Sequence, residues 1–155
     1  MLVQEDILLR PLELTDLDFL FDFENDKLIR KNTVSEHSFS KKQLREYINN
    51  AKQDILIADQ FRFVIDAKGV PVGCIDLFDY DLLNSQSYIG IGILKKHRGS
   101  GVGKKALHSL IRYAFGELGI DKLYATILPV NKYSIALFCS VGFSHLNKNI
   151  YILSK

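Results

Sequence analysis

The sequence predicts an α/β fold of the mixed α+β kind, in which a central mixed sheet of about six to seven strands is flanked by about four helices. Segments of strand and helix character follow one another in the order β-α-α-β-β-β-α-β-α-β-β. The 155 residues contain no repeat, low-complexity stretch or linker. A chain of this length can bury a sizeable core, so residues 1–155 are expected to form a single domain.

The N-terminal part is expected to form one strand and then two helices. Residues 6–12 have strand character. Thr15 is positioned to cap a helix whose apolar spacing continues to Leu28. A second helix is indicated by Ser40 and Gln43, which have the spacing of a capping box.

The rest of the chain supplies the other strands and two more helices. Strand character and turn residues predict a hairpin of residues 55–66 and 70–80, a strand at 88–94, a strand at 121–128 and a final hairpin at 143–153. Asn131 is expected to cap a short helix that ends at Gly142.

Residues 86–118 predict an anion-binding loop between a strand and a helix. Residues 88–94 are β-branched and apolar, and a helix with one apolar face follows Gly103. Three glycines at alternate positions leave the N–H groups of the first helical turn open, and a side chain at Gly101 or Gly103 would block them. A helix start offers unpaired N–H donors and a partial positive charge, so phosphate is the expected ligand.

The glycine spacing excludes two common phosphate loops. In a Walker loop ending at Gly103-Lys104, the first glycine would stand where the chain has Arg98, and the hydroxyl residue where it has Lys105. A Rossmann fingerprint that starts at Gly99 would need its third glycine at Lys104.

Composition excludes several other classes. The formal net charge is +2 and the hydrophobic content is 47%, which is ordinary for a soluble domain, and no apolar run is long enough for a membrane helix. The opening residues do not resemble a signal peptide. Cys74 and Cys139 stand in apolar surroundings and are expected to be reduced core residues of a cytoplasmic protein. The four histidines show no metal-site spacing, so no metal is expected.

A cluster of basic residues surrounds the glycine loop, namely Lys95, Lys96, Arg98, Lys104 and Lys105. Such a cluster could bind nucleic-acid phosphates or one polyphosphate cofactor. The cluster is short and no aromatic residues are interleaved with it, so we favour the cofactor and expect no nucleic-acid partner.

Four stretches, in the right order and over nearly all of the chain, resemble the GCN5-related N-acetyltransferases, and most closely the bacterial ribosomal-protein and spermidine acetyltransferase branch. The most specific is Arg98-x-x-Gly101-x-Gly103, which resembles the pyrophosphate loop of that family. The others are Leu8–Leu12 with Asp16 and Glu24-Asn25-Asp26, then Val72–Leu77, and finally Asn131-x-x-Ser134 with Phe138 and Gly142-Phe143.

The resemblance implies a single acetyltransferase domain that moves an acetyl group from acetyl-CoA to a primary amine of a small molecule or peptide. The amine would attack the thioester directly in a ternary complex, and the enzyme would be a monomer or homodimer. The alternative is a catalytically silent acyl-CoA-binding or regulatory domain. The residues that would bind acetyl-CoA are Ile91, Gly92, Ile93, Arg98, Gly99, Ser100, Gly101, Val102, Gly103, Lys104, Asn131, Ser134 and Phe138.

Two glycines in the central strand, Gly90 and Gly92, allow two interpretations. They could permit a bulge and close approach of a ligand, or they could make room for an aromatic ring packed against the strand.

The reaction needs a base, because an alkylammonium acceptor with a pKa of about 10.4 must lose a proton before it attacks. Asp76 and Asp79 are the candidates, since they follow one another on a strand expected next to the central one. The alternative for both is an ordinary solvent-facing carboxylate. Glu24 and Asp26 could line the acceptor site, although surface charge is the simpler interpretation.

The family often uses a tyrosine of the late helix as the acid that protonates the leaving thiolate. The matching position here is Phe138, which has no proton to give. Tyr133, Tyr124 and Cys139 are nearby candidates for a substitute acid. Alternatively, the thiolate leaves unaided, because a thiol pKa of about 8.5 makes it a tolerable leaving group.

Overall fold

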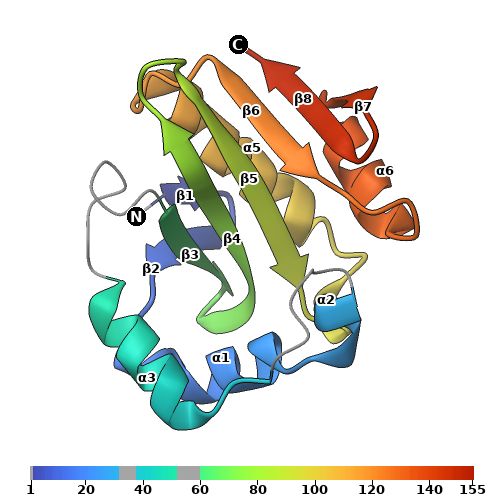
Figure 1. Ribbon diagram of the computed structural model, residues 1–155. Helices are drawn as coiled ribbons and strands as arrows, with labels where there is room; N and C mark the ends of the chain where they lie inside the picture. Colours follow the sequence, from blue (N-terminus) through green and yellow to red (C-terminus); the bar gives the residue numbers. More distant parts are fainter. Residues whose placement is uncertain (1, 32–37, 52–59) are drawn as a thin grey trace.

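One mixed sheet of eight strands organises the part of the chain that the computed structural model describes, residues 2–31, 38–51 and 60–155 (Figure 1). The strands are β1 (Leu2–Gln4), β2 (Ile7–Pro11), β3 (Gln60–Ala67), β4 (Val70–Asp81), β5 (Gln86–Ile93), β6 (Lys122–Thr126), β7 (Ser144–Asn147) and β8 (Ile150–Ser154). Their order is β1-β2-β3-β4-β5-β6-β8-β7. All neighbours are antiparallel except β5 and β6, which are parallel.

Helices cover both faces of the sheet. They are α1 (Leu17–Glu24), α2 (Lys27–Lys31), α3 (Lys41–Asn50), α5 (Val102–Gly116) and α6 (Lys132–Ser140), with two 3₁₀ turns, η1 (Leu14–Asp16) and η2 (Lys95–His97). Adjacent residues of β3 face opposite ways: Phe63 and Ile65 belong to the core under α5, and Val64 to the core under α1 and α3. Among the described residues, no helix is both long and apolar enough to cross a membrane.

The mixed α/β class of the sequence analysis is confirmed, and the sheet has one strand more than the expected six to seven. The extra strand is β1, which pairs with β2 around a turn in which Glu5 has a φ of 53°. Its three residues are too short for a periodicity signal. The expected strand at 55–66 is described from Gln60 onward, and residues 55–59 lie outside the described ranges.

The expected first helix is wrong in two details. Thr15 is not its cap, because Glu13 caps the 3₁₀ turn and Asp16 then precedes α1. The helix also stops at Glu24 instead of continuing to Leu28. Asp26 restarts the chain as α2 by accepting hydrogen bonds from the N–H groups of Leu28 and Ile29, at 2.9 and 3.0 Å. A short polar side chain satisfies the helix-start donors here and so overrides the apolar spacing.

The capping box of α3 is confirmed. The Ser40 hydroxyl accepts from the Gln43 N–H at 3.1 Å, and the Gln43 side chain accepts from the Ser40 N–H at 2.9 Å.

The two cysteines differ in burial. Cys74 is buried as expected, but Cys139 is exposed, because it lies on the outer side of α6 while Phe138 faces the core.

A salt-bridge cluster fixes the N-terminal strand to the first helix. The Arg10 guanidinium donates two hydrogen bonds of 2.8 Å to Asp16, which is only 4% exposed, and one of 3.0 Å to Asp66 on β3. The Glu13 N–H donates to the same Asp16 carboxylate at 2.8 Å. Burial alone would raise the pKa of Asp16, but the bonds from Arg10 and Glu13 outweigh it and hold that pKa below its usual value.

Replacing Arg10 with alanine should destabilise the fold by about 2–3 kcal/mol, because Asp16 then stays buried without its counter-ion. A carboxyl with a depressed folded-state pKa adds stability above its unfolded pKa of about 3.9, and that stability disappears as the pH falls through the folded value. The difference in unfolding free energy between wild type and Arg10→Ala should therefore be largest at neutral pH and shrink below about pH 4.

The matched control is Lys41→Ala, which removes the exposed salt bridge between Lys41 and Asp18. Urea unfolding of this variant should show a loss below about 1 kcal/mol, because exposed ion pairs contribute little. Equal losses in the two variants would contradict the structural role of the Arg10 cluster.

Candidate active site

A cleft opens where the parallel strands β5 and β6 part. Their pairing covers only Gln86–Lys122, Ser87–Leu123 and Tyr88–Tyr124. Beyond this point β6 stays paired with β8 as far as Thr126, while β5 continues alone on that side to Ile93. A cavity of about 230 Å³ lies between the diverging ends of β5 and β6. An edge of β5 is thus free to hydrogen bond with an extended ligand.

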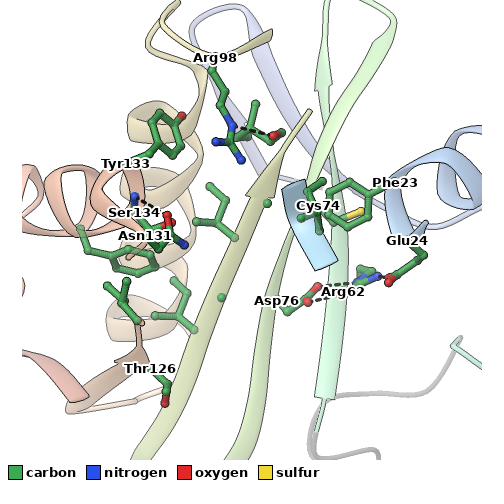
Figure 2. A pocket seen from close by; sticks show the side chains of 18 residues that line it. Phe23, Glu24, Arg62, Cys74, Asp76, Arg98, Thr126, Asn131, Tyr133 and Ser134 are labelled. Atoms are coloured by element: carbon green, nitrogen blue, oxygen red, sulfur yellow. Dashed lines mark hydrogen bonds and ion pairs between the residues drawn. The ribbon is translucent and has the colours of Figure 1, made fainter. Parts of the chain in front are cut away.

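The cavity has two walls on opposite sides of β5 (Figure 2). One wall comes from the end of β6, the segment after it and α6, and its labelled members are Thr126, Asn131, Tyr133 and Ser134, with Arg98 beyond the end of β5. The other wall comes from α1, β3 and β4, with Phe23, Glu24, Arg62, Cys74 and Asp76. The expected α6 residues Asn131, Ser134 and Phe138 all line the cavity, as do Ile91, Gly92 and Ile93 of β5.

The glycine loop leads from the end of β5 into α5. Gly99 and Gly101 both have a φ of +84°, a conformation that side chains disfavour. Gly101 is the N-cap of α5 and supplies no side chain to the first-turn N–H groups. Gly103 has a different reason to lack a side chain, since a Cβ there would lie 3.0 Å from a methyl carbon of Leu137 on α6. The loop therefore presents an uncapped helix start, the arrangement that binds anions.

Arg98 is held at the mouth of the cleft by two contacts. Its Nε donates to the carbonyl oxygen of Ile93 at 3.0 Å, and its guanidinium lies over the Tyr133 ring at 4.5 Å from the ring centre. Burial raises the pKa of Tyr133, and the neighbouring Arg98 only partly opposes this. The Tyr133 hydroxyl lies 3.4 Å from the Cβ position of Gly103, so Tyr133 sits beside the start of α5.

The remaining loop residues lie outside the cavity lining, on the surface of the loop and of the first turn of α5. The Ser100 hydroxyl donates to the carbonyl of His97 at 3.0 Å. Lys105 of the basic cluster is already paired with Glu5 and Asp6, at 2.8 and 2.9 Å. Less of the cluster's charge is therefore free for a long polyanion than the sequence suggests.

The two strand glycines serve different purposes. A Cβ on Gly92 would lie 2.7 Å from the Phe23 ring, so the aromatic-packing interpretation holds at this position. A Cβ on Gly90 would meet only the Phe78 ring, at an ordinary contact distance of 3.4 Å. Gly90 stands opposite Asp76 in the register of β4 and β5. The space above Gly90 lets the cavity reach Asp76.

A buried arginine that the sequence analysis did not identify joins two carboxylates in the cavity wall. Arg62 donates two hydrogen bonds of 2.8 Å to Asp76 and a further one to Glu24. Its guanidinium also lies 5.7 Å from the Phe23 ring centre and 5.9 Å from that of Tyr47. Burial alone would lower the pKa of Arg62, but Asp76 raises it well above its ordinary value, so the group stays charged.

The candidate bases fare differently. Asp76 lines the cavity, but both of its oxygens are engaged by Arg62. Asp79 lies on β4 beside the central strand, as expected, but it is exposed, has a φ of 50° and lies outside the cavity, which favours the solvent-facing alternative. It stands in the irregular part of β4 between Phe78 and Asp81, where the register to β5 shifts. Glu24 does line the cavity, whereas Asp26 is the cap of α2.

None of the substitute acids lies on the β4 and α1 side of the cavity. Phe138 is buried in the α6 wall, edge-on to Phe143 at 5.0 Å. Tyr124 packs against Tyr88 at 5.6 Å, and neither it nor the exposed Cys139 lines the cavity. Cys74 does line it, but burial raises the pKa of its thiol far above the neutral range.

Comparison with known proteins assigns this architecture. A family model described as an acetyltransferase (GNAT) domain matches residues 6–144. An uncharacterized SPbeta prophage-derived N-acetyltransferase of Bacillus subtilis is 28% identical over 140 residues, which cover 90% of this chain and 76% of that protein. Spermidine N(1)-acetyltransferase of Vibrio cholerae is 26% identical over 148 residues, covering 93% and 84%.

The fold is that of a solved member with its cofactor. A crystal structure of spermidine N-acetyltransferase from Vibrio cholerae in complex with CoA and spermine superposes with a TM-score of 0.82 at 20% identity, covering 96% of this chain and 93% of that one. Another structure of a Vibrio cholerae spermidine N-acetyltransferase is dodecameric. The chain therefore belongs to the GNAT acetyltransferase family and is an acetyl-CoA-dependent N-acetyltransferase.

Proposed function

We propose that acetyl-CoA lies in the cleft between β5 and β6 and that the acceptor amine attacks its thioester directly, within a ternary complex. The observation that carries this proposal is the continuity of two features: the free edge of β5 ends at Ile93, and the uncapped start of α5 follows within the next ten residues. An extended arm with amides followed by a pyrophosphate matches these features in that order.

Each end of the cofactor has a defined set of partners in this proposal. The pyrophosphate takes backbone N–H groups of residues 99–104, next to the side-chain charge of Arg98, whose own N–H already donates to the carbonyl of Lys95. The pantetheine arm pairs with the edge formed by Ile91, Gly92 and Ile93, and the α6 residues Asn131, Ser134 and Phe138 form the facing wall. The pantetheine arm extends from the glycine loop along β5, so the thioester lies near Gly90, where the cavity is open on the side of Asp76.

The acceptor side carries a net negative charge. Glu24 and Asp76 contribute two negative charges and Arg62 one positive charge, so the three linked groups sum to −1. A cationic amine is attracted to this charge, and its ammonium must release one proton to solvent before attack. We assign Asp76 an electrostatic role, because Arg62 occupies both of its oxygens. Asp79 has no role in this scheme.

The chemical step then needs no protein acid. The amine nitrogen bonds to the thioester carbon and gives a second proton to solvent, the carbon–sulfur bond breaks, and the electron pair leaves on the thiolate. A thiolate is tolerable as a leaving group in neutral water, and orientation in the cleft can lower the barrier by several kcal/mol. We assign Tyr133 to holding Arg98, since its ring lies on that guanidinium and its hydroxyl beside the start of α5.

The finer points of this assignment stay predictions. They are an acceptor that is a small molecule or a peptide, a monomer or homodimer, a cytoplasmic location, and the absence of a metal and of a nucleic-acid partner. The paired state of Lys105 favours the last of these.

Gly101→Val should weaken CoA binding at least about tenfold, because a β-branched residue disfavours the φ of +84° and would distort the loop that receives the pyrophosphate. Isothermal titration calorimetry with CoA measures the effect. Gly69→Val is the matched control: it imposes the same strain, at a φ of +86° in the turn between β3 and β4, with open space around it. Gly69→Val should lose stability but keep its CoA affinity. Full CoA affinity in folded Gly101→Val would overturn the cofactor site.

The turnover rate should rise with pH toward the pKa of the acceptor amine, with no descending limb, because no protein acid has to stay protonated. Tyr133→Phe should keep this profile, since the ring that contacts Arg98 remains. The profile is measured as kcat against pH at saturating acetyl-CoA. A descending limb in the wild type that vanishes in Tyr133→Phe would instead identify Tyr133 as the acid.

Phe138→Tyr adds a phenol at the position where the family often has its acid. It should raise kcat if departure of the thiolate limits turnover, and introduce a descending limb near the phenol pKa of about 10. The test is to measure kcat of the wild type and of Phe138→Tyr at several pH values. A Phe138→Tyr variant that binds CoA normally but gains neither rate nor a descending limb would show that proton donation at this position is irrelevant here.

A further inference from the structure

A second cavity lies on the far side of Arg62 from the cofactor cleft. It has a volume of about 350 Å³, within the range of small-molecule sites. Its described lining comes from the end of α1, from α3 and its approach, and from β3, namely Glu24, Phe39, Gln43, Leu44, Tyr47, Gln60 and Arg62. Glu24 and Arg62 also line the cofactor cleft, so these two side chains form a common boundary of the two cavities.

Glu24 offers a free oxygen at this boundary. Arg62 donates to Oε1 of Glu24, while Oε2 takes no hydrogen bond from any residue of the described ranges. Arg62 itself is immobilised by Asp76 and by the rings of Phe23 and Tyr47, so it holds Glu24 in a defined position. The linked carboxylates and the guanidinium together lack one positive charge, which one ammonium group would supply.

The rest of the second cavity suits a neutral, apolar body. The rings of Phe39 and Tyr47 and the side chain of Leu44 line it. Its polar groups besides the ion pair are the Tyr47 phenol and two amides, and the oxygen of the Gln43 amide is already engaged in the capping box of α3. Burial raises the pKa of Tyr47 to about 12, which keeps its phenol neutral. Among the described lining residues, Glu24 is the one carboxylate, so a second ammonium group would be desolvated there without a partner.

We propose that this second cavity binds the non-reacting body of the acceptor, with its ammonium group at Glu24, and that the acceptor class is a primary monoamine carrying an aromatic or branched apolar group. This inference rests on the proposed function and narrows its acceptor. The acceptor that we propose differs from spermidine, the extended polycation after which a similar protein of Vibrio cholerae is named.

The first test compares acceptors with the wild-type enzyme and needs no variant. Thiol release from saturating acetyl-CoA is followed with 2-phenylethylamine, hexylamine and spermidine. We expect kcat/KM for 2-phenylethylamine to exceed that for spermidine by about tenfold or more, because only the former buries an apolar ring and adds no second charge. A preference for spermidine over both monoamines would overturn the inference and leave the proposed function intact.

The second test uses variants of the cavity lining. Phe39→Ala and Tyr47→Ala should each raise KM for 2-phenylethylamine about tenfold and leave KM for acetyl-CoA unchanged, while Tyr47→Phe should restore the wild-type value. Phe21→Ala is the matched control, since it removes a half-buried ring of the same helical layer outside both cavities. Its KM values should equal those of the wild type.

Two outcomes distinguish a failure of the second cavity as a binding site from a failure of the proposed function. Equal KM changes in Phe21→Ala and in the lining variants would mean that the helical layer is merely loosened, and would overturn the second cavity as a binding site. Absence of transfer to every amine, with CoA still bound, would contradict the proposed function itself.

Discussion

The early end of the pairing between β5 and β6 is the constraint on which the site depends. After three residue pairs, β6 follows β8 and leaves one side of β5 without a partner strand. Unpaired backbone groups in a protein interior are costly, so a strand edge of this kind persists only where water or a ligand completes it. Because β5 leads into the glycine loop, the same divergence aligns an amide-binding edge with an anion-binding helix start (Figure 1). The position that we propose for acetyl-CoA therefore depends on backbone geometry more than on any single side chain.

Packing on the opposite face of β5 sets the acceptor side. Phe23 lies against Gly92, which brings α1 close to the strand and places Glu24 at the cavity. Arg62 then links Glu24 to Asp76 by ion pairs in a partly buried wall. A buried guanidinium is costly unless its donors are satisfied, and removing one partner would leave an uncompensated charge. The ion cluster therefore serves both the fold and the electrostatics of the acceptor site that we propose.

Phe138 stands at the position where the family often has its tyrosine acid, and the nearby phenol of Tyr133 has a different setting. Phe138 keeps the apolar contact with Phe143 in the α6 wall, and Tyr133 places its phenol at the cofactor mouth under Arg98. Neither position offers a proton at the acceptor side of the cavity. The reaction that we propose therefore depends on orientation and on the leaving ability of the thiolate.

The sequence by itself determined the α/β class, the family, the glycine loop and the α6 wall, because these depend on local spacing: an apolar strand, glycines at alternate positions, and an Asn cap. Only the tertiary structure decided the acceptor side. Arg62 lies 14 residues from Asp76 and 38 from Glu24 along the chain, and no local pattern indicates that the three meet. Asp79 stands on the expected strand, but the local pattern does not show that it is exposed in an irregular part of β4. Cys139 was misplaced because apolar neighbours in sequence do not fix which side of a helix is covered. Long-range contacts and irregular backbone are the information that a single sequence does not carry.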